Sequence, residues 1–378
     1  MPTASSSRVA ACAFSALFSM AVGCVSGPSR DSPAQRIEPA TAVPTDPAFT
    51  WQLPTGFPEP YVPANNPMSA AKVSLGRYLF YDTRLSGNGH FSCASCHRQK
   101  LAFTDGRDRA MGSTGELHPR SAMSLTNVAY SASYNWADPA LTLLEDQALG
   151  PLLNRKPIEL GVAGREDEVL DRLRADVETV ASFEAAFPGE PISLATIVRA
   201  IAAFERTLVS GNSPYDRYLF WGEPLTDGEM RGLKLFFSER LRCAECHSGL
   251  NLSGPVRAAD ATFEIGERVD PAAQRSDGGQ RFKAPTLRNI AVTAPYMHDG
   301  RFSSLEEVVR FYAAGGRPVV RASVLESELA GGFSLTDREL EDLIAFLGAL
   351  TDHDFLGDPR FADPRESGQS DTLLAPPV

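Results

Sequence analysis

Two short stretches of this chain combine cysteine and histidine at the same spacing. They read CASCH at residues 93–97 and CAECH at residues 243–247, and both follow the pattern Cys-x-x-Cys-His. In that pattern two thiols attach to one haem and the histidine binds its iron. A single motif could instead be a redox or zinc-binding pair, whereas two that both end in histidine favour two covalently bound haem c groups. The expected residues are Cys93, Cys96 and His97 for the first haem, and Cys243, Cys246 and His247 for the second.

The residues that could bind the opposite face of each iron are less clearly marked. Outside the two motifs the chain offers His90, His118, His298 and His353, with several methionines and tyrosines. An iron with an open sixth position can bind peroxide, whereas a methionine ligand favours electron transfer. Met297, in APYMHDG, is the simplest candidate for the second haem, although a methionine that only packs against the porphyrin would look the same.

The composition is that of a globular chain and limits its partners. The chain has 378 residues, 43% hydrophobic and 22% charged, which is enough for two domains with separate cores. The formal net charge of -11 argues against nucleic acid as a partner, because a phosphate backbone requires a basic surface.

The first 24 residues predict an export signal. They contain one arginine, a short apolar stretch and small residues before Cys24, and they are too short to span a membrane. The ending AVGC resembles a bacterial lipobox, so we expect a lipid on Cys24 that anchors the protein on the periplasmic side of a membrane. An ordinary signal peptide cut elsewhere is the alternative. Because Cys12 and Cys24 belong to this signal, the two motifs use all four remaining cysteines.

Both motifs follow closely on predicted helices, and the chain shows no convincing strands. LGRYLFYD precedes FSCASCH, and RGLKLFFS precedes LRCAECH, which indicates two related cytochrome c-like haem domains in a mostly α fold with long loops. Apolar spacing or a capping box predicts helices at 68–82, 165–176, 194–209, 305–314, from 226 and from 336. The predicted organisation is a signal peptide (1–24), a Pro/Ser-rich tether (25–60), two haem domains (61–215 and 216–356) and a tail (357–378).

From about residue 60 to 352 the chain resembles the bacterial di-haem cytochrome c peroxidase and MauG family. The matching stretches are LGRYLFYDTRLSGNGHFSCASCH, PRSAMSLTNVAY, LEDQALGPLLNRKPIEL, LKLFFSERLRCAECHSG and APTLRNIAVTAPYMHDGRFSSLEEVVRFY. The resemblance implies that the first haem reacts with peroxide and that the second is a six-coordinate electron-transfer haem.

The resemblance also changes the expected ligand of the second iron. Peroxidases of this family use a methionine at a fixed spacing after a Thr-x-Pro segment, and the same count from Thr293 reaches Tyr312. MauG-type proteins carry tyrosine there, so Tyr312 replaces Met297 as the expected ligand. A hard, anionic phenolate favours high-valent iron, whereas a soft thioether favours ferrous iron.

Four further residues match the family's peroxide pocket. Gln147 and Glu159 correspond to its distal glutamine and glutamate, Pro151 to its pocket wall, and Trp136 to the tryptophan between the haems. Glu159 would move a proton between the peroxide oxygens, and Trp136 would relay oxidising equivalents. Without the resemblance, Glu159 would read as a solvated loop carboxylate and Trp136 as a core aromatic. The loops before Gln147 and before Glu159 are slightly longer than usual in the family.

Two other positions depart from the family pattern. Ser113 stands where activation-dependent peroxidases have a distal histidine, which implies an open iron, with His118 as the rival ligand. The family's calcium site uses an asparagine that is Ser121 here, together with carbonyl groups around Thr293 and Pro295. Calcium prefers oxygen ligands, so it remains a candidate cofactor at these three residues.

The resemblance implies a MauG-like enzyme that uses hydrogen peroxide and high-valent iron to oxidise an aromatic residue of a partner protein. One subgroup, with the methanobactin-associated enzyme MbnH, looks closest, and its implied partner is an exported copper-binding protein, MbnP, whose tryptophan becomes kynurenine. The surface tryptophan of MauG before the second motif is Leu241 here, so Trp221 is a candidate exit for oxidising equivalents.

Two rival functions are open on the sequence. A di-haem cytochrome c peroxidase would reduce hydrogen peroxide with electrons from a small cytochrome c. A non-enzymatic electron carrier would have two six-coordinate irons.

Overall fold

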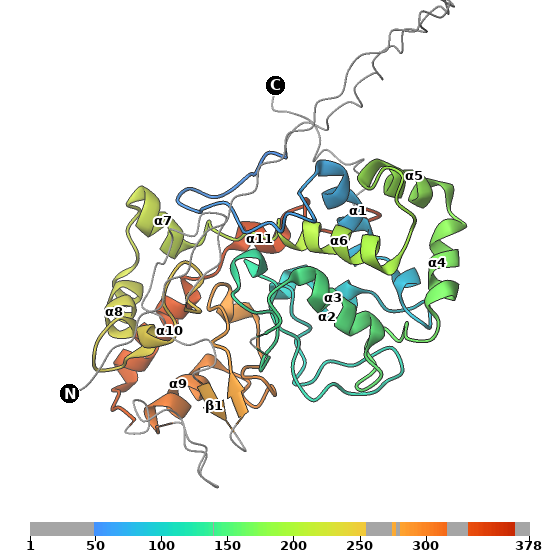
Figure 1. Ribbon diagram of the computed structural model, residues 1–378. Coiled ribbons are helices and arrows are strands. Elements are labelled where there is room, and N and C mark those ends of the chain that lie inside the picture. Colours follow the sequence, from blue (N-terminus) through green and yellow to red (C-terminus); the bar gives the residue numbers. More distant parts are fainter. Residues whose placement is uncertain (1–48, 139, 255–273, 277–279, 316–331, 367–378) are drawn as a thin grey trace, which may run out of the picture. The chain divides into compact units, whose positions relative to one another are not determined.

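The computed structural model describes residues 49–366 except 139, 255–273, 277–279 and 316–331 (Figure 1). The predicted signal peptide, its Cys24, most of the predicted tether and the last residues of the tail lie outside the described residues. No helix within the described ranges is long and apolar enough to cross a membrane.

Helices dominate the described chain. Those of its first part are α1 (Ala70–Phe80), α2 (Cys93–Cys96), α3 (Leu144–Leu153), α4 (Glu166–Arg174), α5 (Val177–Ala186), α6 (Leu194–Glu205), and short 3-10 turns η1 (Thr83–Leu85), η2 (Gln99–Leu101) and η3 (Val128–Tyr130). Those that follow are α7 (Pro214–Trp221), α8 (Asp227–Phe236), α9 (Leu305–Ala313), α10 (Asp337–Gly348), α11 (His353–Gly357), and turns η4 (Cys243–Glu245) and η6 (Ile290–Val292). The mostly α fold is confirmed, and each predicted helix is present.

One strand pair departs from the expectation that the chain has no strands. β1 (Gln274–Ser276) pairs antiparallel with β2 (Gln280–Phe282), and Arg275 lies opposite Arg281. Strands of three residues are too short for a period-two pattern to show in the sequence, so nothing in the sequence predicts them.

The same helix pair occurs twice, and a glycine permits the close contact in each. We call residues 70–208 the first half and residues 214–350 the second half. α1 packs on α6 and α8 packs on α10 (Figure 1). A Cβ on Gly76 would lie 1.9 Å from the Ala200 carbonyl oxygen, and one on Gly232 would lie 1.9 Å from the Asp342 carbonyl oxygen. Both glycines are therefore required by the backbone approach of the two helices.

An asparagine in the left-handed region repeats in the same way. Asn127 and Asn289 have φ of 53° and 60° and precede η3 and η6. Their N–H groups donate to the carbonyl oxygens of Leu208 and Leu350, both at 2.9 Å. Asparagine tolerates this backbone conformation better than other residues with a side chain. The two halves thus share a backbone framework as well as a motif.

Each half also has its own hydrophobic cluster. Apart from Phe355 and Phe361, the first cluster ends in sequence at Leu208, and the second begins at Tyr215. The predicted domain boundary near residue 215 falls between the two clusters in sequence.

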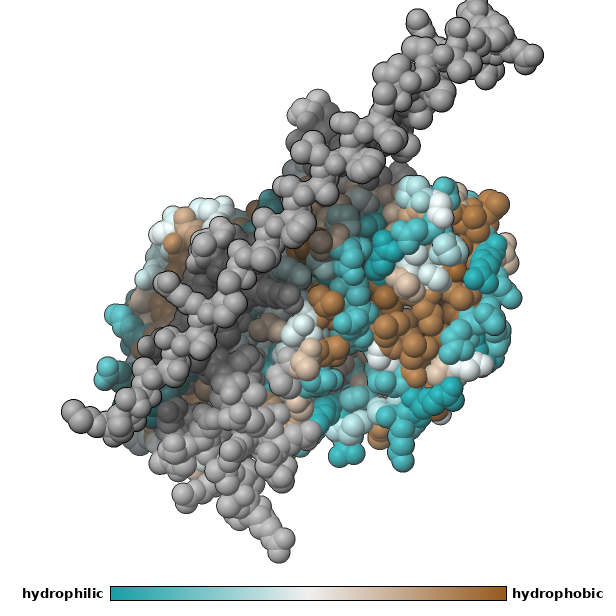
Figure 2. Space-filling view, in the orientation of Figure 1, coloured by the Kyte–Doolittle hydropathy of each residue, from teal (hydrophilic) through white to brown (hydrophobic). Residues whose placement is uncertain are grey.

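The surface of the molecule also carries apolar residues. Figure 2 shows a patch of them, bordered by hydrophilic residues, on the right-hand part of the face drawn there. Contiguous apolar surface of this kind is typical of ligand or partner sites.

The ends of the described chain are packed, which shortens the predicted tether and tail. Phe57 is 8% exposed, and the Tyr130 hydroxyl donates to the Pro58 carbonyl oxygen at 2.7 Å. Arg77 donates to the carbonyl oxygens of Pro359 and Ala362 at 2.7 and 2.8 Å. Residues 49–60 and 358–362 therefore belong to the fold, and composition missed this because their partners lie far away in the sequence.

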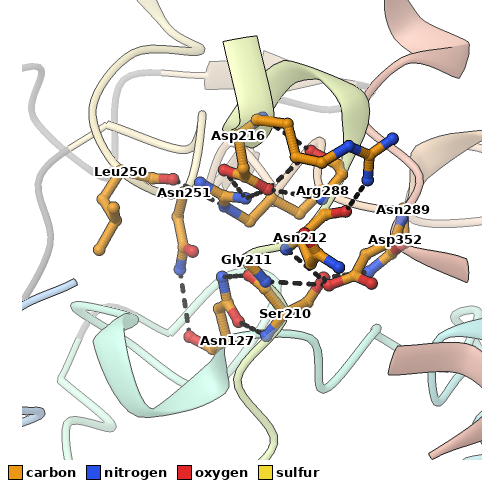
Figure 3. Close-up of polar contacts among 12 residues, drawn as sticks. Asn127, Ser210, Gly211, Asn212, Asp216, Leu250, Asn251, Arg288, Asn289 and Asp352 are labelled. Atoms are coloured by element: carbon orange, nitrogen blue, oxygen red, sulfur yellow. Dashed lines mark hydrogen bonds and ion pairs between the residues drawn. The ribbon is translucent and has the colours of Figure 1, made fainter. Parts of the chain in front are cut away.

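A polar network joins the two halves (Figure 3). Its centre is the Asp352 carboxylate, which accepts hydrogen bonds from the Ser210 hydroxyl and from two backbone N–H groups at 2.9–3.1 Å. The Asn251 side chain donates to the Asn127 carbonyl oxygen at 3.1 Å, and Arg288 pairs with buried Asp216 at 2.9 Å. Buried ionic and amide groups with several partners fix one arrangement of the segments that carry them.

Candidate haem sites

The first motif forms α2, a single helical turn. Ser92 caps its start, and neither cysteine is in a disulfide. The Nδ1 atom of His97 lies 2.7 Å from the Phe103 carbonyl oxygen, and burial lowers the pKa of the ring below its usual value. A neutral imidazole whose Nδ1–H donates to a carbonyl keeps its lone pair on Nε2, as a metal ligand requires. This residue set fits a haem c whose iron is bound by His97.

The second motif has the same arrangement on a different local backbone. η4 covers Cys243 to Glu245, and again neither cysteine is in a disulfide. The Nδ1 atom of His247 lies 3.0 Å from the Leu252 carbonyl oxygen, and burial lowers the pKa of this ring as well. The donor set fits a second haem c for the same reason.

A largely apolar cavity lies directly against the second motif. Tyr312 from α9 and Met297 from the preceding loop both line it, together with Cys243, Cys246 and His247. Burial raises the pKa of the Tyr312 phenol, and the two thiols raise it further if they are charged. The structure thus places both sequence candidates for the distal ligand, the tyrosine and the methionine, on one cavity with the expected proximal histidine.

The charged residues on this cavity are all basic. No aspartate or glutamate is among its described lining residues. Besides His247, the basic and histidine side chains there are Arg242, Lys283, His298 and Arg301. His298 stacks on Phe282 with 4.0 Å between ring centres, which agrees with a structural role in its turn. Leu241, where MauG has a surface tryptophan, is 1% exposed and lines the same cavity.

The candidate peroxide residues come from α3 and the loop after it. Gln147 and Pro151 are four residues apart on α3 and therefore share one face. The Leu160 N–H donates to the Pro151 carbonyl oxygen at 2.8 Å, which holds Glu159 next to that end of the helix. Within the described chain the Gln147 carboxamide has no hydrogen-bond partner, so it is available to a ligand.

Glu159 has the electrostatic environment of an acid–base group. Burial raises the pKa of its carboxyl group, while His118 and a hydrogen bond from Asn154 act in the opposite direction. The charge of Glu159 in turn contributes to the raised pKa of both Cys93 and Cys96. Glu159 is therefore electrostatically coupled to both cysteines of the first motif, as a proton-transfer group for the first haem would be.

The two candidates for the distal position of the first haem lie in the loop beside Glu159. The Ser113 N–H donates to the Glu159 carbonyl oxygen at 2.7 Å. His118 is held by its own loop, because the Arg120 N–H donates to its Nδ1 atom at 3.1 Å. The same Nδ1 atom lies 3.2 Å from the Arg120 carbonyl oxygen, so both polar backbone groups of Arg120 face this edge of the ring.

Trp136 and the three calcium candidates line a second cavity, between the two halves. The Trp136 indole donates to the Ser121 carbonyl oxygen at 3.0 Å. Thr293 and Pro295 approach from the second half, and Trp136 also lines the haem cavity described above. Trp136 is thus positioned beside the second haem site, as a relay would require.

Comparison with known proteins places these features in one family. Residues 70–223 match the model of the di-haem cytochrome c peroxidase family. The Methylamine utilization protein MauG of Methylorubrum extorquens is 34% identical over 309 residues, which cover 79% of this chain and 83% of that protein. The chain belongs to the di-haem cytochrome c peroxidase and MauG family. It is a haem-dependent oxidoreductase that acts with peroxide, and the resemblance expected from the sequence is confirmed.

Other relatives cover both named branches of the family. Cytochrome c peroxidase Ccp of Escherichia coli is 34% identical over 301 residues, covering 76% of this chain and 60% of that protein. The crystal structure of a MauG-like protein associated with microbial copper homeostasis is 43% identical, covers 84% of this chain and all of that one, and superposes with a TM-score of 0.78. The MauG-like branch is therefore supported by structure as well as by sequence.

Two ionisable residues of the described chain were not singled out from the sequence. Glu205, on α6, is 5% exposed, and its Oε2 atom has no hydrogen-bond partner in the described chain. A carboxylate inside the apolar run LATIVRAIAAFERTLVS was a visible signal. Lys283 lines both cavities, and its position in an irregular loop gave no periodic pattern from which to find it.

Proposed function

We propose that this protein uses hydrogen peroxide and two covalently attached haem c groups to oxidise an aromatic residue of a partner protein. The residue is a tryptophan, and the product is kynurenine. The observation that carries the proposal is the position of Tyr312 on the same cavity as Cys243, Cys246 and His247. A tyrosine ligand suits an iron that holds oxidising equivalents better than one that waits in the reduced state.

The proposed partner is an exported copper-binding protein similar to MbnP. The support is the likeness to the MauG-like protein associated with microbial copper homeostasis, which extends over 84% of this chain. The predicted export signal, with a lipid on Cys24, would place the enzyme on the periplasmic side, where such a partner is available. Two molecules of hydrogen peroxide convert tryptophan to N-formylkynurenine and water, and hydrolysis then releases formate to leave kynurenine.

The chain's own residues divide the work between the two sites. When bound, the haems supply the oxidising chemistry with peroxide. Glu159 holds a carboxyl group with a raised pKa near the first motif, which suits it to take a proton from one peroxide oxygen and deliver it to the other. Gln147 and Pro151 shape the same side of the first site, where the unpaired carboxamide can hold the peroxide by a hydrogen bond.

Tyr312 is a neutral phenol in the protein alone, because burial raises its pKa. A metal cation within ligand distance reverses this preference, since it stabilises the phenolate. The largely apolar lining of the cavity would keep water away from the phenolate oxygen. The second site is therefore suited to an oxidised iron, and Trp136 lies on its wall as the relay towards the first half.

The test is the substitution Tyr312→Met in the holoprotein. We expect the absorption changes that follow peroxide addition to decay at least ten-fold faster than in the unchanged protein, because a thioether no longer stabilises the oxidised state. Met297→Leu removes the rival ligand and Tyr296→Phe removes another cavity hydroxyl, so both should leave the decay rate unchanged. An unchanged decay in Tyr312→Met, or a fast decay in Met297→Leu, would refute the assignment of Tyr312.

The alternative is a cytochrome c peroxidase, favoured by the relatives that carry this name. Such an enzyme would consume peroxide rapidly with a reduced small cytochrome c as donor. We expect slow turnover with that donor and oxidation of the partner's tryptophan, detected by mass spectrometry of the partner after peroxide addition. Brisk cytochrome oxidation with an unmodified partner would establish the alternative.

A further inference from the structure

The expected proximal histidine of the first haem faces a residue with an unusual backbone. The Phe103 carbonyl oxygen lies 2.7 Å from the Nδ1 atom of His97. Phe103 has φ of 62° and Ala102 before it has φ of 50°, so two consecutive residues with side chains lie in the left-handed region. For a bulky residue this conformation is a rare exception that persists only where the surroundings enforce it. The contacts around Phe103 therefore decide where its carbonyl group points.

The second half repeats this feature at its own motif. The Leu252 carbonyl oxygen lies 3.0 Å from the Nδ1 atom of His247, and Leu252 has φ of 50°. Phe103 and Leu252 are both buried. In each half a bulky residue thus takes a costly backbone conformation and presents its carbonyl group to the imidazole. Backbone strain gathers at functional sites, and here its result is the direction of that carbonyl group.

The contacts that hold Phe103 include a helix from beyond the second half. The Phe355 ring of α11 packs on the Phe103 ring with 5.7 Å between ring centres, and the Phe80 ring of α1 packs on it at 6.0 Å. The Gln99 carboxamide donates to the carbonyl oxygens of Phe355 and Asp358 at 3.1 and 2.8 Å. Because Gln99 begins η2, these bonds tie the turn just before Phe103 to α11.

α11 is itself held by the polar network that joins the two halves. Asp352 caps the start of α11 by accepting a hydrogen bond from the Phe355 N–H at 3.1 Å. The same residue donates its own N–H to the Asn289 side-chain oxygen at 2.7 Å and accepts from the Ser210 hydroxyl at 3.1 Å. A continuous set of contacts therefore leads from the second half, through α11, to the carbonyl group that faces His97.

We propose that α11 is a positioning element for His97, which holds the Phe103 carbonyl group against the Nδ1 atom from outside the first half. A carbonyl oxygen that accepts a hydrogen bond from Nδ1–H makes an imidazole a stronger electron donor to its metal. With haem c bound, α11 would thus strengthen the bond from His97 to the iron and favour the oxidised iron. The proposal depends on the two haem sites and not on the identity of the partner protein.

The test measures the iron–histidine bond itself. Phe355→Leu removes a ring that packs on Phe103, and Gln99→Leu removes both hydrogen bonds to α11 at a half-buried position, without opening a cavity. In the reduced holoproteins, resonance Raman spectroscopy should show the iron–histidine stretching band of the first haem at a lower frequency. Redox titration should show its ferric–ferrous equilibrium moved about three-fold towards the ferrous form, because the hydrogen bond is loosened and not removed.

Phe183→Leu separates this role from a general loss of packing. Phe183 is 2% exposed in the same hydrophobic cluster, and its ring does not contact that of Phe103 in the described chain. This control should lower the free energy of unfolding but leave the stretching band and the redox equilibrium unchanged. An unchanged band in both Phe355→Leu and Gln99→Leu, or an equal shift in Phe183→Leu, would overturn the proposal.

Discussion

The two haem sites share a framework and differ in the groups around it. In both, an imidazole Nδ1 atom faces a backbone carbonyl oxygen, and a helix pair with a glycine contact supports the motif. Around the first motif lie the carboxyl groups of Glu159 and Glu205, whose charges both contribute to the raised pKa of Cys93. The cavity of the second motif is lined by apolar and basic side chains, with one phenol, Tyr312, on α9 and no carboxylate among the described residues.

The backbone framework that positions each haem is the same in both halves, whereas the side chains that would decide its chemistry differ. The repeated framework explains two haem positions, because it recurs with the same glycine and asparagine roles in each half. Proton transfer requires an ionisable group within reach, which the first site has in Glu159. In the proposed function the second site stores an oxidising equivalent, and Tyr312 on its largely apolar cavity would be the ligand of the oxidised iron.

The largest effect is expected from Glu159→Gln, which removes the proposed acid–base group of the first site and leaves the second site unchanged. Glu159→Gln should lower the rate of reaction with peroxide about 10²–10⁴-fold, because the amide cannot carry a proton between the peroxide oxygens. Stopped-flow absorption after mixing with peroxide measures this rate. Glu116→Gln is the control. The Glu116 carboxylate accepts a hydrogen bond from the Ile158 N–H at 3.2 Å, so this variant alters a contact of the same loop without removing Glu159. A loss no larger than that of the control would contradict the role of Glu159.

The shared framework can be tested by making the same change in both halves. Gly76→Ala and Gly232→Ala should each lower the free energy of unfolding by about 1–3 kcal/mol or more, because the new methyl group meets a backbone carbonyl oxygen. Gly348→Ala, with nothing within 4 Å of its new Cβ, should be neutral or raise it by up to about 1 kcal/mol. Chemical denaturation of the holoproteins measures all three. A large loss in only one of the first two would show that the halves are not equivalent in packing.

The buried carboxyl group of the first half should make stability depend on pH. Burial raises the pKa of Glu205 from 4.5 to about 8, so the folded state binds the proton more tightly than the unfolded state does. Stability from this group is full below about pH 4.5 and is lost as the pH rises towards 8. Glu205→Gln should therefore raise the free energy of unfolding at pH 8 by about 1–3 kcal/mol and flatten its pH dependence.

Urea denaturation at several pH values measures this dependence. Glu178→Gln, on the surface of α5, is the matched control and should leave the curve unchanged. If the control and Glu205→Gln gave the same curve, Glu205 would be ionised in the folded protein.

The smallest effect on stability is expected at two exposed apolar side chains, one in each half. Trp221 is 51% exposed and Leu117 is 57% exposed. Substitution of either by alanine should change the free energy of unfolding by no more than about 0.5 kcal/mol. Trp221→Ala should nevertheless slow oxidation of the partner protein, because it removes the candidate exit on the second half, whereas Leu117→Ala should not. Equal partner oxidation in both variants would exclude an exit through Trp221.

The sequence predicted the parts of the fold whose signals are local. Capping boxes and apolar spacing placed α6, α8 and α10, and the motif spacing identified both haem positions. The strand pair and the packed ends were missed, because their partners come from distant or irregular segments. Glu159 and Tyr312 were predicted only through the family resemblance, since neither has a local pattern, and their roles stay predictions.

The network centred on Asp352 has a consequence for attempts to divide the molecule. This carboxylate lies beyond the second half, yet its partners Ser210 and Gly211 belong to the segment between the halves (Figure 3). The Asp352 N–H also donates to the Asn289 side-chain oxygen at 2.7 Å. A fragment that ends near residue 215 would keep the donors of that network and lose their acceptor. The two haem modules are therefore not autonomous, and a genetic truncation at the apparent boundary would leave the core of the first without Phe355 and Phe361.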